Sequence, residues 1–159
     1  MLAENGYSPI LIERGGSVIE RAKQIESFKH TRRLDTDTNI QFGAGGAGTF
    51  SDGKLVTRIN DPSSAYVIRR FIEFGAPESI RYLAKPHIGT DYLQKIVDKI
   101  LSRISELGGE VRYHTRFEGV IEKTDKTLEV KTNQGNISCG ALVLATGHSA
   151  RDTYEMLIP

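Results

Sequence analysis

Two short runs of the chain are apolar throughout, and they predict buried strands of a parallel sheet. Ile10-Leu11-Ile12 is followed at once by polar Glu13, and residues 141–145 (ALVLA) end in Thr146-Gly147. A strand that helices cover on both faces reads as a continuous apolar run, without the alternation of a half-exposed strand. We therefore expect both runs inside an α/β sheet, with Glu13 and Thr146-Gly147 at the edge where the strands end.

Apolar residues at helical spacing predict helices between and beyond these runs. Ser17 and Glu20 match a capping box and open a helix that continues to about Lys29. Thr90 is expected to cap the longest helix, which ends at Leu107 before a pair of glycines. Further helices are expected over residues 1–5 (the last turn of one), 63–74, 77–83 and 150–159.

Three short segments after the longest helix are separated by turn residues, which is typical of strands. They cover residues 111–115, 119–122 and 128–131, and turns are indicated at Asp125 and at residues 133–135. This pattern predicts an antiparallel β-meander laid onto the main fold. With the two apolar runs, it indicates the α/β class, a doubly wound parallel sheet with an added meander.

Residues 41–55, which read QFGAGGAGTFSDGKL, hold five glycines and are called the glycine loop below. A backbone with so few Cβ atoms can bring its N–H groups close to an anionic ligand, although composition alone also fits a flexible linker. Gly43, Gly45 and Gly48 spell the G-x-G-x-x-G dinucleotide fingerprint, but without its preceding buried strand and following helix. Residues 48–54 approach a P-loop, but Leu55 stands where the magnesium-binding Ser or Thr is required. We expect a ligand-binding loop of another kind.

Composition and charge argue against several classes of protein. The chain has 159 residues, with 21 basic and 20 acidic side chains, so no net field favours nucleic acid or an anionic membrane. Cys139 is the only cysteine and no apolar run has the length of a membrane helix, which favours a cytoplasmic protein. The four histidines lack metal-ligand spacing, so no metal site is expected. His114 is interpreted as a solvated strand residue, whereas His148 fits a cofactor neighbour and a surface residue equally well.

These motifs resemble those of the flavoproteins with two dinucleotide-binding domains, and within them the bacterial FAD-dependent dehydrogenases. Residues 12–15 (IERG) resemble the family's second strand with its ribose-binding acidic residue, and the glycine loop resembles the signature loop on the flavin side. Residues 85–91 (KPHIGTD) resemble the block that follows, and residues 145–152 (ATGHSARD) resemble the second FAD motif. The resemblance covers nearly the whole chain and implies a Rossmann-like fold that binds FAD.

The resemblance implies a role for each matched position. Glu13 would accept hydrogen bonds from ribose hydroxyls, Arg14 would flank the adenine, and the backbone near Phe117 would contact the adenine edge. The glycine loop would line the pyrophosphate and the isoalloxazine, and the small residues after the last strand would approach the pyrophosphate. Ala44 stands where the family pattern has an acidic residue, so the role of that carboxylate is not carried over. The implied cofactor-binding residues are Glu13, Arg14, Gly43, Gly45, Gly46, Gly48, Ser51, Gly53, Lys54, Phe117, Ala145, Thr146 and Gly147.

The family pattern also extends beyond both ends of the chain. Its members begin with a strand and a GxGxxG turn and continue to a final FAD motif, so residues 1–159 would be one partial FAD/NAD(P)-binding domain, truncated at both ends. We expect the FAD-binding portion of an oxidoreductase that transfers hydride through the flavin, with NAD(P)H as a donor for the full-length protein. Alone it would bind FAD weakly or not at all and be inactive, and the sheet edge left by the missing strand would favour self-association. The alternative is a non-catalytic nucleotide-binding or interaction module that uses the same edge.

Overall fold

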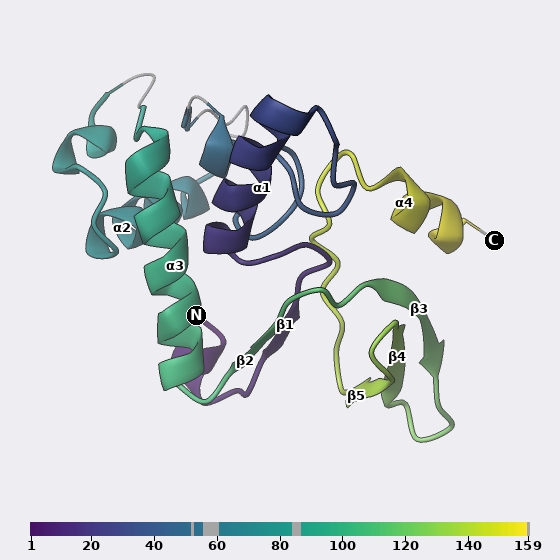
Figure 1. Cartoon of the computed structure of the whole chain (residues 1–159). Helices are drawn as coiled ribbons and strands as arrows, with labels where there is room; N and C mark the ends of the chain where they lie inside the picture. Colours follow the sequence, from purple (N-terminus) through teal and green to yellow (C-terminus); the bar gives the residue numbers. More distant parts are fainter. Residues whose placement is uncertain (52, 56–60, 84–86, 159) are drawn as a thin grey trace.

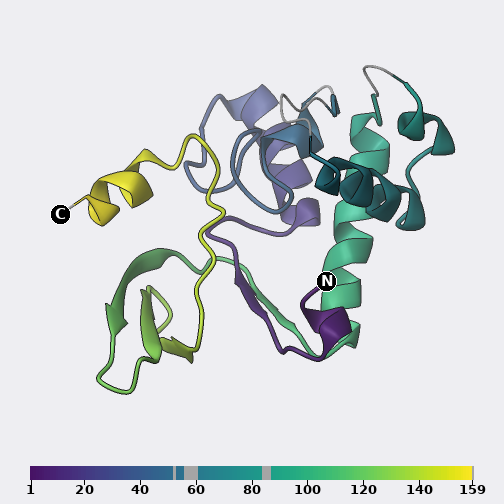
Figure 2. The same ribbon diagram turned by 180° about the vertical axis from the view of Figure 1, so that it is seen from behind.

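The computed structural model describes residues 1–51, 53–55, 61–83 and 87–158. Helices α1 (Val18–Thr31), α2 (Ser63–Glu73) and α3 (Thr90–Glu106) gather on one side of the molecule, as seen from both directions in Figures 1 and 2. A short parallel sheet lies beside them, and an antiparallel sheet and helix α4 (Arg151–Leu157) occupy the other side. The predicted mixture of helices and both kinds of sheet is confirmed at this level.

The parallel sheet consists of β1 (Ile10–Ile12) and β2 (Glu110–Arg112). β1 was expected, but β2 overlaps a segment that was predicted to belong to the meander. It pairs with β1 instead, because helix α3 brings the chain back alongside β1, as in the usual crossover between parallel strands. The prediction that β1 is buried on both faces is wrong, since Ile10 and Leu11 are 41% and 37% exposed. β2 covers only one edge of β1, so much of the apolar strand stays in contact with solvent.

Helix α1 begins as the sequence predicts. The Ser17 hydroxyl accepts from the Glu20 N–H at 3.3 Å, and the Glu20 carboxylate accepts from the Ser17 N–H at 2.7 Å. This reciprocal pair satisfies two N–H groups that a helix start otherwise leaves unpaired. The helix follows directly from the turn after β1, so the capping box fixes the direction in which the chain leaves the sheet.

The main apolar core lies where α2, α3 and the short helix η3 (Glu78–Arg81) meet. Its most buried members, Ile80 and Ile96, are 2% and 1% exposed. The predicted extents of α2 and α3 are confirmed to within a residue or two, but the expected cap is wrong. Gly89 occupies the N-cap of α3 and no side chain caps it, so Thr90 is the first helical residue. The expected helix at residues 77–83 is a shorter 3-10 helix, and so is η1 (Ala3–Asn5) at the start of the chain.

The meander is built from β3 (Phe117–Glu122), β4 (Leu128–Thr132) and β5 (Ile137–Cys139), paired in that order and antiparallel. The predicted turns at Asp125 and residues 133–135 are confirmed as the connections between these strands. β5 was not predicted, because it is short and follows a polar turn. Its residue Ile137 is buried at 9% exposure and faces the same small core as Val130 of β4.

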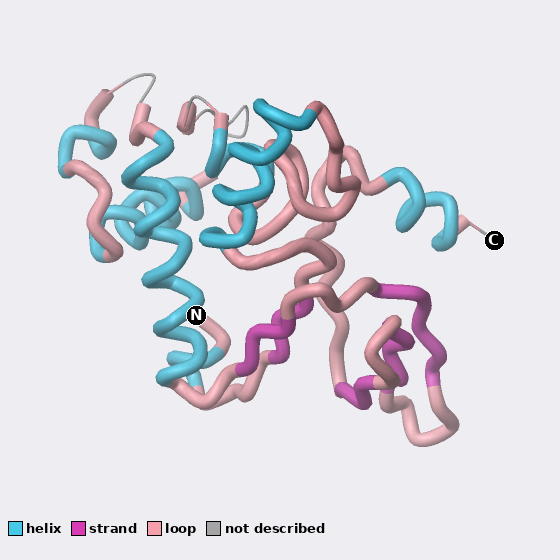
Figure 3. The backbone as a smooth tube through the Cα atoms, in the orientation of Figure 1, coloured by secondary structure: helices cyan, strands magenta, loops and turns pink. Residues whose placement is uncertain are grey.

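Residues 141–145 do not form the predicted strand. The segment is extended but unpaired in the described part of the chain, and Figure 3 shows it as a long connection between the meander and α4. Val143 and Leu144 are 78% and 44% exposed. A strand requires a neighbour to accept its backbone hydrogen bonds, and neither sheet supplies one here. The expected edge at Thr146-Gly147 is therefore not the end of a strand, and both residues are exposed.

Candidate functional site

The backbone after β1 and the backbone after β2 run side by side, and together they form the strand-end rim, residues 13–16 and 113–116. Pairing continues beyond the strands, since Thr115 N–H donates to the Glu13 carbonyl at 2.9 Å and His114 N–H donates to the Gly15 carbonyl at 3.1 Å. The rim thus brings Glu13 and Arg14 beside the chain that leads into Phe117. The Glu13 carboxylate folds back and accepts from Gly15 N–H at 2.8 Å.

Arg14 connects three segments that are far apart in the sequence. Its Nε donates to Asp37 Oδ1 at 2.6 Å, and its Nη1 pairs with the carboxylate of Asp152 at the start of α4. Burial lowers the pKa of Arg14, but hydrogen bonds with Asp152 and Asp37 outweigh it and leave that pKa raised. The same Arg14 bond lowers the pKa of Asp152. Gln41 of the glycine loop also hydrogen-bonds Ser149, so the segment after residue 147 is fastened beside the rim.

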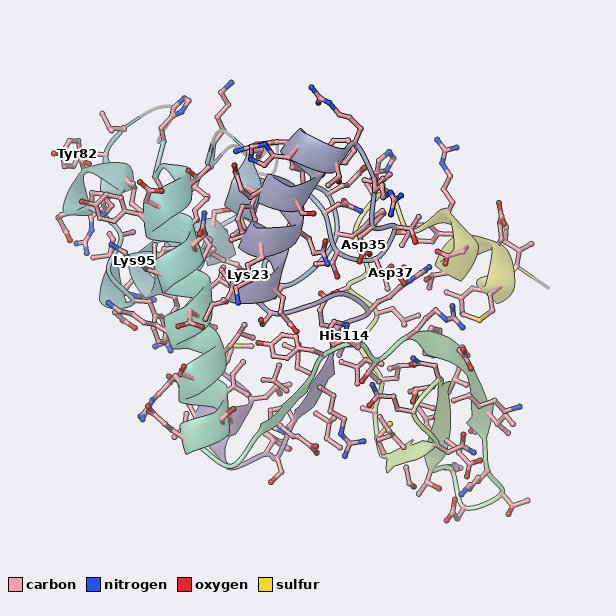
Figure 4. The ribbon with its side chains drawn as sticks, viewed as in Figure 1. Lys23, Asp35, Asp37, Tyr82, Lys95 and His114 are labelled. Carbon is pink, nitrogen blue, oxygen red and sulfur yellow. The ribbon has the colours of Figure 1, made fainter. Side chains whose placement is uncertain are left out.

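A polar cavity of about 330 Å³ opens at this rim. Figure 4 places Asp35, Asp37 and His114 around the space between α1, the end of β2 and α4. The size is at the lower end for small-molecule sites, and the wall offers both donors and acceptors. A ligand that carries both kinds of group, as a nucleoside does, matches such a wall. The lining residues are Arg14, Glu20, Gln24, Asp35, Asp37, Thr38, His114, Arg116 and Asn133.

His114 lines the cavity in an unusual backbone conformation. The strand ends at Arg112, and His114 has φ +53°, so the expectation of a strand histidine is wrong. The conformation is held from two sides: Asn133 Nδ2 donates to the His114 carbonyl at 3.0 Å, and the His114 ring Nε2 lies 3.3 Å from Glu20 Oε1. Hydrogen bonds from Ser17, and then from His114, lower the pKa of Glu20. Glu20 is thus held as a carboxylate in the cavity wall.

The glycines of the glycine loop fall into two groups. A Cβ on Gly43 would lie 2.7 Å from Cδ of Arg21, one on Gly45 would lie 2.9 Å from Cγ2 of Val97, and one on Gly53 would lie 2.8 Å from the Gly89 nitrogen. These three are needed by the packing of the chain itself. Gly46 and Gly48, by contrast, are exposed, and apart from their chain neighbours no described residue has an atom within 4 Å of a Cβ placed on either, which leaves room for a ligand to approach.

Arg21 of α1 hydrogen-bonds the backbone at the start of the glycine loop, and its role was not predicted from the sequence. Its side chain is 0% exposed, and its guanidinium donates to the carbonyls of Asn39 and Ile40, each at 2.8 Å, and of Ala44 at 2.7 Å. A further, longer bond of 3.3 Å reaches Gly43, and the ring of Phe50 stacks 4.7 Å from the guanidinium carbon. Burial lowers the pKa of Arg21 to about 10, although the Glu13 charge opposes this. An arginine within a helix carries no local signal of such long-range bonds.

The structure brings only some of the predicted site residues together. Glu13 and Arg14 form the rim, and Gly43 lies against Gly15, with a Gly15 Cβ position 2.8 Å from the Gly43 Cα. Gly53 and Lys54 lie instead at the start of α3, where Gly53 accepts from Ile88 N–H at 3.0 Å and Lys54 bridges His87. The remaining positions are exposed or half-buried and have no described bond to a residue of the cavity wall: Gly45, Gly46, Gly48, Ser51, Phe117, Ala145, Thr146 and Gly147. Asp52, Lys85 and Pro86 lie outside the described residues.

Two negative findings apply to the described ranges. No group of three His, Cys, Asp or Glu side chains there converges to hold a metal ion. No helix in the same ranges combines the length and apolarity needed to cross a membrane.

Comparison with known proteins gives one informative similarity. The chain is 49% identical over 156 residues to a curated protein of Clostridium beijerinckii whose description is "Uncharacterized protein". The match covers 98% of this chain but 29% of that relative, so the chain corresponds to less than a third of the relative's length. No family model matches the chain.

Proposed function

We propose that the chain forms the FAD-binding portion of a flavin-dependent oxidoreductase with a Rossmann-like fold. The observation that carries this proposal is the convergence at the strand-end rim. Arg14 reaches Asp152 across 138 positions, and Gly15 packs against Gly43 of the glycine loop. Three motifs that resemble FAD motifs are thus adjacent in space, at the end of parallel strands where nucleotide sites of α/β folds lie.

The residues at the rim fit the adenosine part of the cofactor. Glu13 uses Oε1 for Gly15 N–H, and no described hydrogen bond uses its Oε2, which can accept from a ribose hydroxyl. Arg14 stands at the cavity wall with a flat guanidinium that can cover a purine face. Gly46 and Gly48 offer backbone without side chains toward the pyrophosphate. When bound, the flavin would supply hydride acceptance at its N5, with NAD(P)H as the donor in the longer protein.

The exposed apolar segments support the Rossmann-like part of the proposal. β1 has an edge that β2 does not cover, and residues 141–145 are apolar, extended and solvent-exposed. A further parallel strand between them would pair with both and bury Leu11 and Val143. Since the first strand of the family fold carries the main pyrophosphate turn, we expect weak or no FAD binding by residues 1–159 alone.

A non-catalytic nucleotide-binding module is the second candidate. The polar cavity favours it, because its charged wall can serve the adenosine part of any nucleotide and requires no flavin. The two candidates differ in whether the isoalloxazine adds affinity. FAD and ADP would bind equally to a nucleotide module, whereas FAD would bind more tightly to a flavoprotein.

A titration tests both candidates. FAD, ADP and riboflavin are added to residues 1–159 and to a chain extended N-terminally by a GxGxxG strand, and binding is followed by flavin fluorescence or calorimetry. We expect binding of FAD by the extended chain, and its loss in Gly48→Leu but not in the matched Gly140→Leu, since both glycines are exposed with open space around them. Failure of FAD to bind either chain would refute the flavoprotein proposal, and equal affinity for ADP would favour the nucleotide module.

A further inference from the structure

Among the described residues, no carboxylate pairs with the buried guanidinium of Arg21. Its described hydrogen bonds go to four backbone carbonyls, those of Asn39, Ile40, Gly43 and Ala44. A buried charge is costly unless its donors are satisfied, and here four of the five guanidinium N–H groups are satisfied by a stretch of chain that is otherwise irregular. Residues 39–44 have no sheet or helix partners, so the arginine supplies bonds that secondary structure supplies elsewhere.

The surroundings of Arg21 are shaped for a planar side chain. Gly43 leaves no room for a Cβ beside the Arg21 Cδ, and the Phe50 ring lies 4.7 Å from the guanidinium carbon. A guanidinium is flat and presents its donors as a fixed fork, whereas an ammonium is a point charge with three donors. Four carbonyls spread over six residues, together with a stacked ring, suit the flat guanidinium of arginine and not the ammonium of lysine.

We infer that Arg21 is the positioning residue of the glycine loop. It draws the carbonyls of Asn39, Ile40, Gly43 and Ala44 inward, and this fixes the backbone that leads into the exposed residues 46–48. The same bonds hold Asn39 and Ile40 against the wall of a second, largely apolar cavity of about 390 Å³ between α1 and residues 34–42. Arg21 holds the loop in this conformation before any ligand binds, whichever ligand that is.

Amide hydrogen exchange measured by NMR on the 159-residue chain tests this role. In Arg21→Ala we expect the amides of Asn39, Phe42, Ala44 and Gly46, all hydrogen-bonded in the structure, to exchange on the order of tenfold faster or more. Amides of α3 and β4 should keep their rates. Lys23→Ala removes an exposed positive charge from the same helix and is the matched control, with no change expected at residues 39–46.

Chemical rescue separates positioning from general destabilisation. Millimolar guanidinium ion should restore slow exchange at residues 39–46 in Arg21→Ala, while the same concentration of urea or ammonium should not. Arg21→Lys should recover only part of the protection. Unchanged exchange at residues 39–46 in Arg21→Ala would overturn the inference, and so would a uniform acceleration along the chain that guanidinium does not reverse. The exchange measurements are made without ligand, so their result is independent of whether the chain binds FAD.

Discussion

At the scale of single residues, Arg14 shows how a side chain gains a role from distant partners. The resemblance of residues 12–15 to the second strand of the flavoprotein family predicts an adenine contact for Arg14. Its partners Asp37 and Asp152 were not predictable, because they lie 23 and 138 positions away and neither has a local signal. Both ion pairs are partly exposed, so their contribution to stability is modest, and their effect is to hold α4 beside the rim.

The pair formed by Arg14 and Asp152 predicts a dependence on acid. The folded-state pKa of Asp152 is lower than the ordinary value of 3.8, chiefly through the hydrogen bond from Arg14. The pair therefore contributes stability above pH 3.8, and the contribution is lost as the pH falls through the lower folded-state pKa. A carboxyl-carbon NMR titration of Asp152 should give a midpoint below 3.8 that returns toward it in Arg14→Gln. An unshifted midpoint in the unsubstituted chain would contradict the pairing.

At the scale of elements, local pattern predicted helices better than strands. The capping box of α1 and the apolar stripes of α2 and α3 lie within their own segments, so the sequence contains the whole signal. The strands depend on partners elsewhere. Residues 111–115 were placed in the wrong sheet because pairing with β1 is set by the return of the chain through α3, and residues 141–145 form no strand without a neighbour.

Substitution by alanine should have opposite effects at Gly45, inside the glycine loop, and at Gly140, outside it. Gly45→Ala should destabilise the chain by about 1–3 kcal/mol, because Gly45 has φ +85° and an added Cβ would meet Thr49 and Val97. Gly140→Ala should be neutral or stabilising by about 0.4–1 kcal/mol, because its φ is ordinary and the space is open. Urea unfolding, with the m-value unchanged between variants, measures both changes in the free energy of unfolding. Equal effects would mean that the loop does not pack against α3 as described.

The core between α2, η3 and α3 sets the stability of the helical side. Ile96→Ala should cost about 2–5 kcal/mol, because the side chain is 1% exposed and its removal leaves a cavity among packed neighbours. Val67→Ala in α2 should lower the free energy of unfolding by less than about 0.5 kcal/mol, because Val67 is 47% exposed. Thermal unfolding followed by circular dichroism distinguishes them. A small effect of Ile96→Ala would place the main core elsewhere.

At the scale of the whole molecule, the α/β class was predictable and the candidate site was predictable only in part. The apolar runs and motifs located Glu13, Arg14 and the glycine loop. The cavity wall also needs His114 and Arg116, which Asn133 of the meander turn hydrogen-bonds, and Thr38, which accepts from Gly16 N–H at 3.0 Å. These polar residues have no periodicity or motif, so their convergence is a property of the fold and not of any segment.

The exposed edge of the parallel sheet predicts self-association. β1 presents an apolar, unpaired edge within the described residues, and such edges pair with other strands. The average mass in sedimentation equilibrium should rise with concentration, and Leu11→Lys should abolish the rise. Ile19→Lys, on the 64% exposed surface of α1, is the control and should have no effect. A concentration-independent monomer mass for the unsubstituted chain would show that the edge is protected.

The contact between Gly15 and Gly43 limits how this sequence can diverge. A Cβ on Gly15 would lie 2.3 Å from the Asp37 carbonyl oxygen and 2.8 Å from the Gly43 Cα, and a Cβ on Gly43 would lie 2.7 Å from Cδ of Arg21. Compensation by a smaller neighbour is closed here, because the obstacles at Gly15 are backbone atoms and the obstacle at Gly43 is Arg21, whose guanidinium binds the carbonyls of the loop. Homologues that retain the turn against the loop should therefore keep both glycines, and a homologue that loses one should also have lost the contact between these two segments.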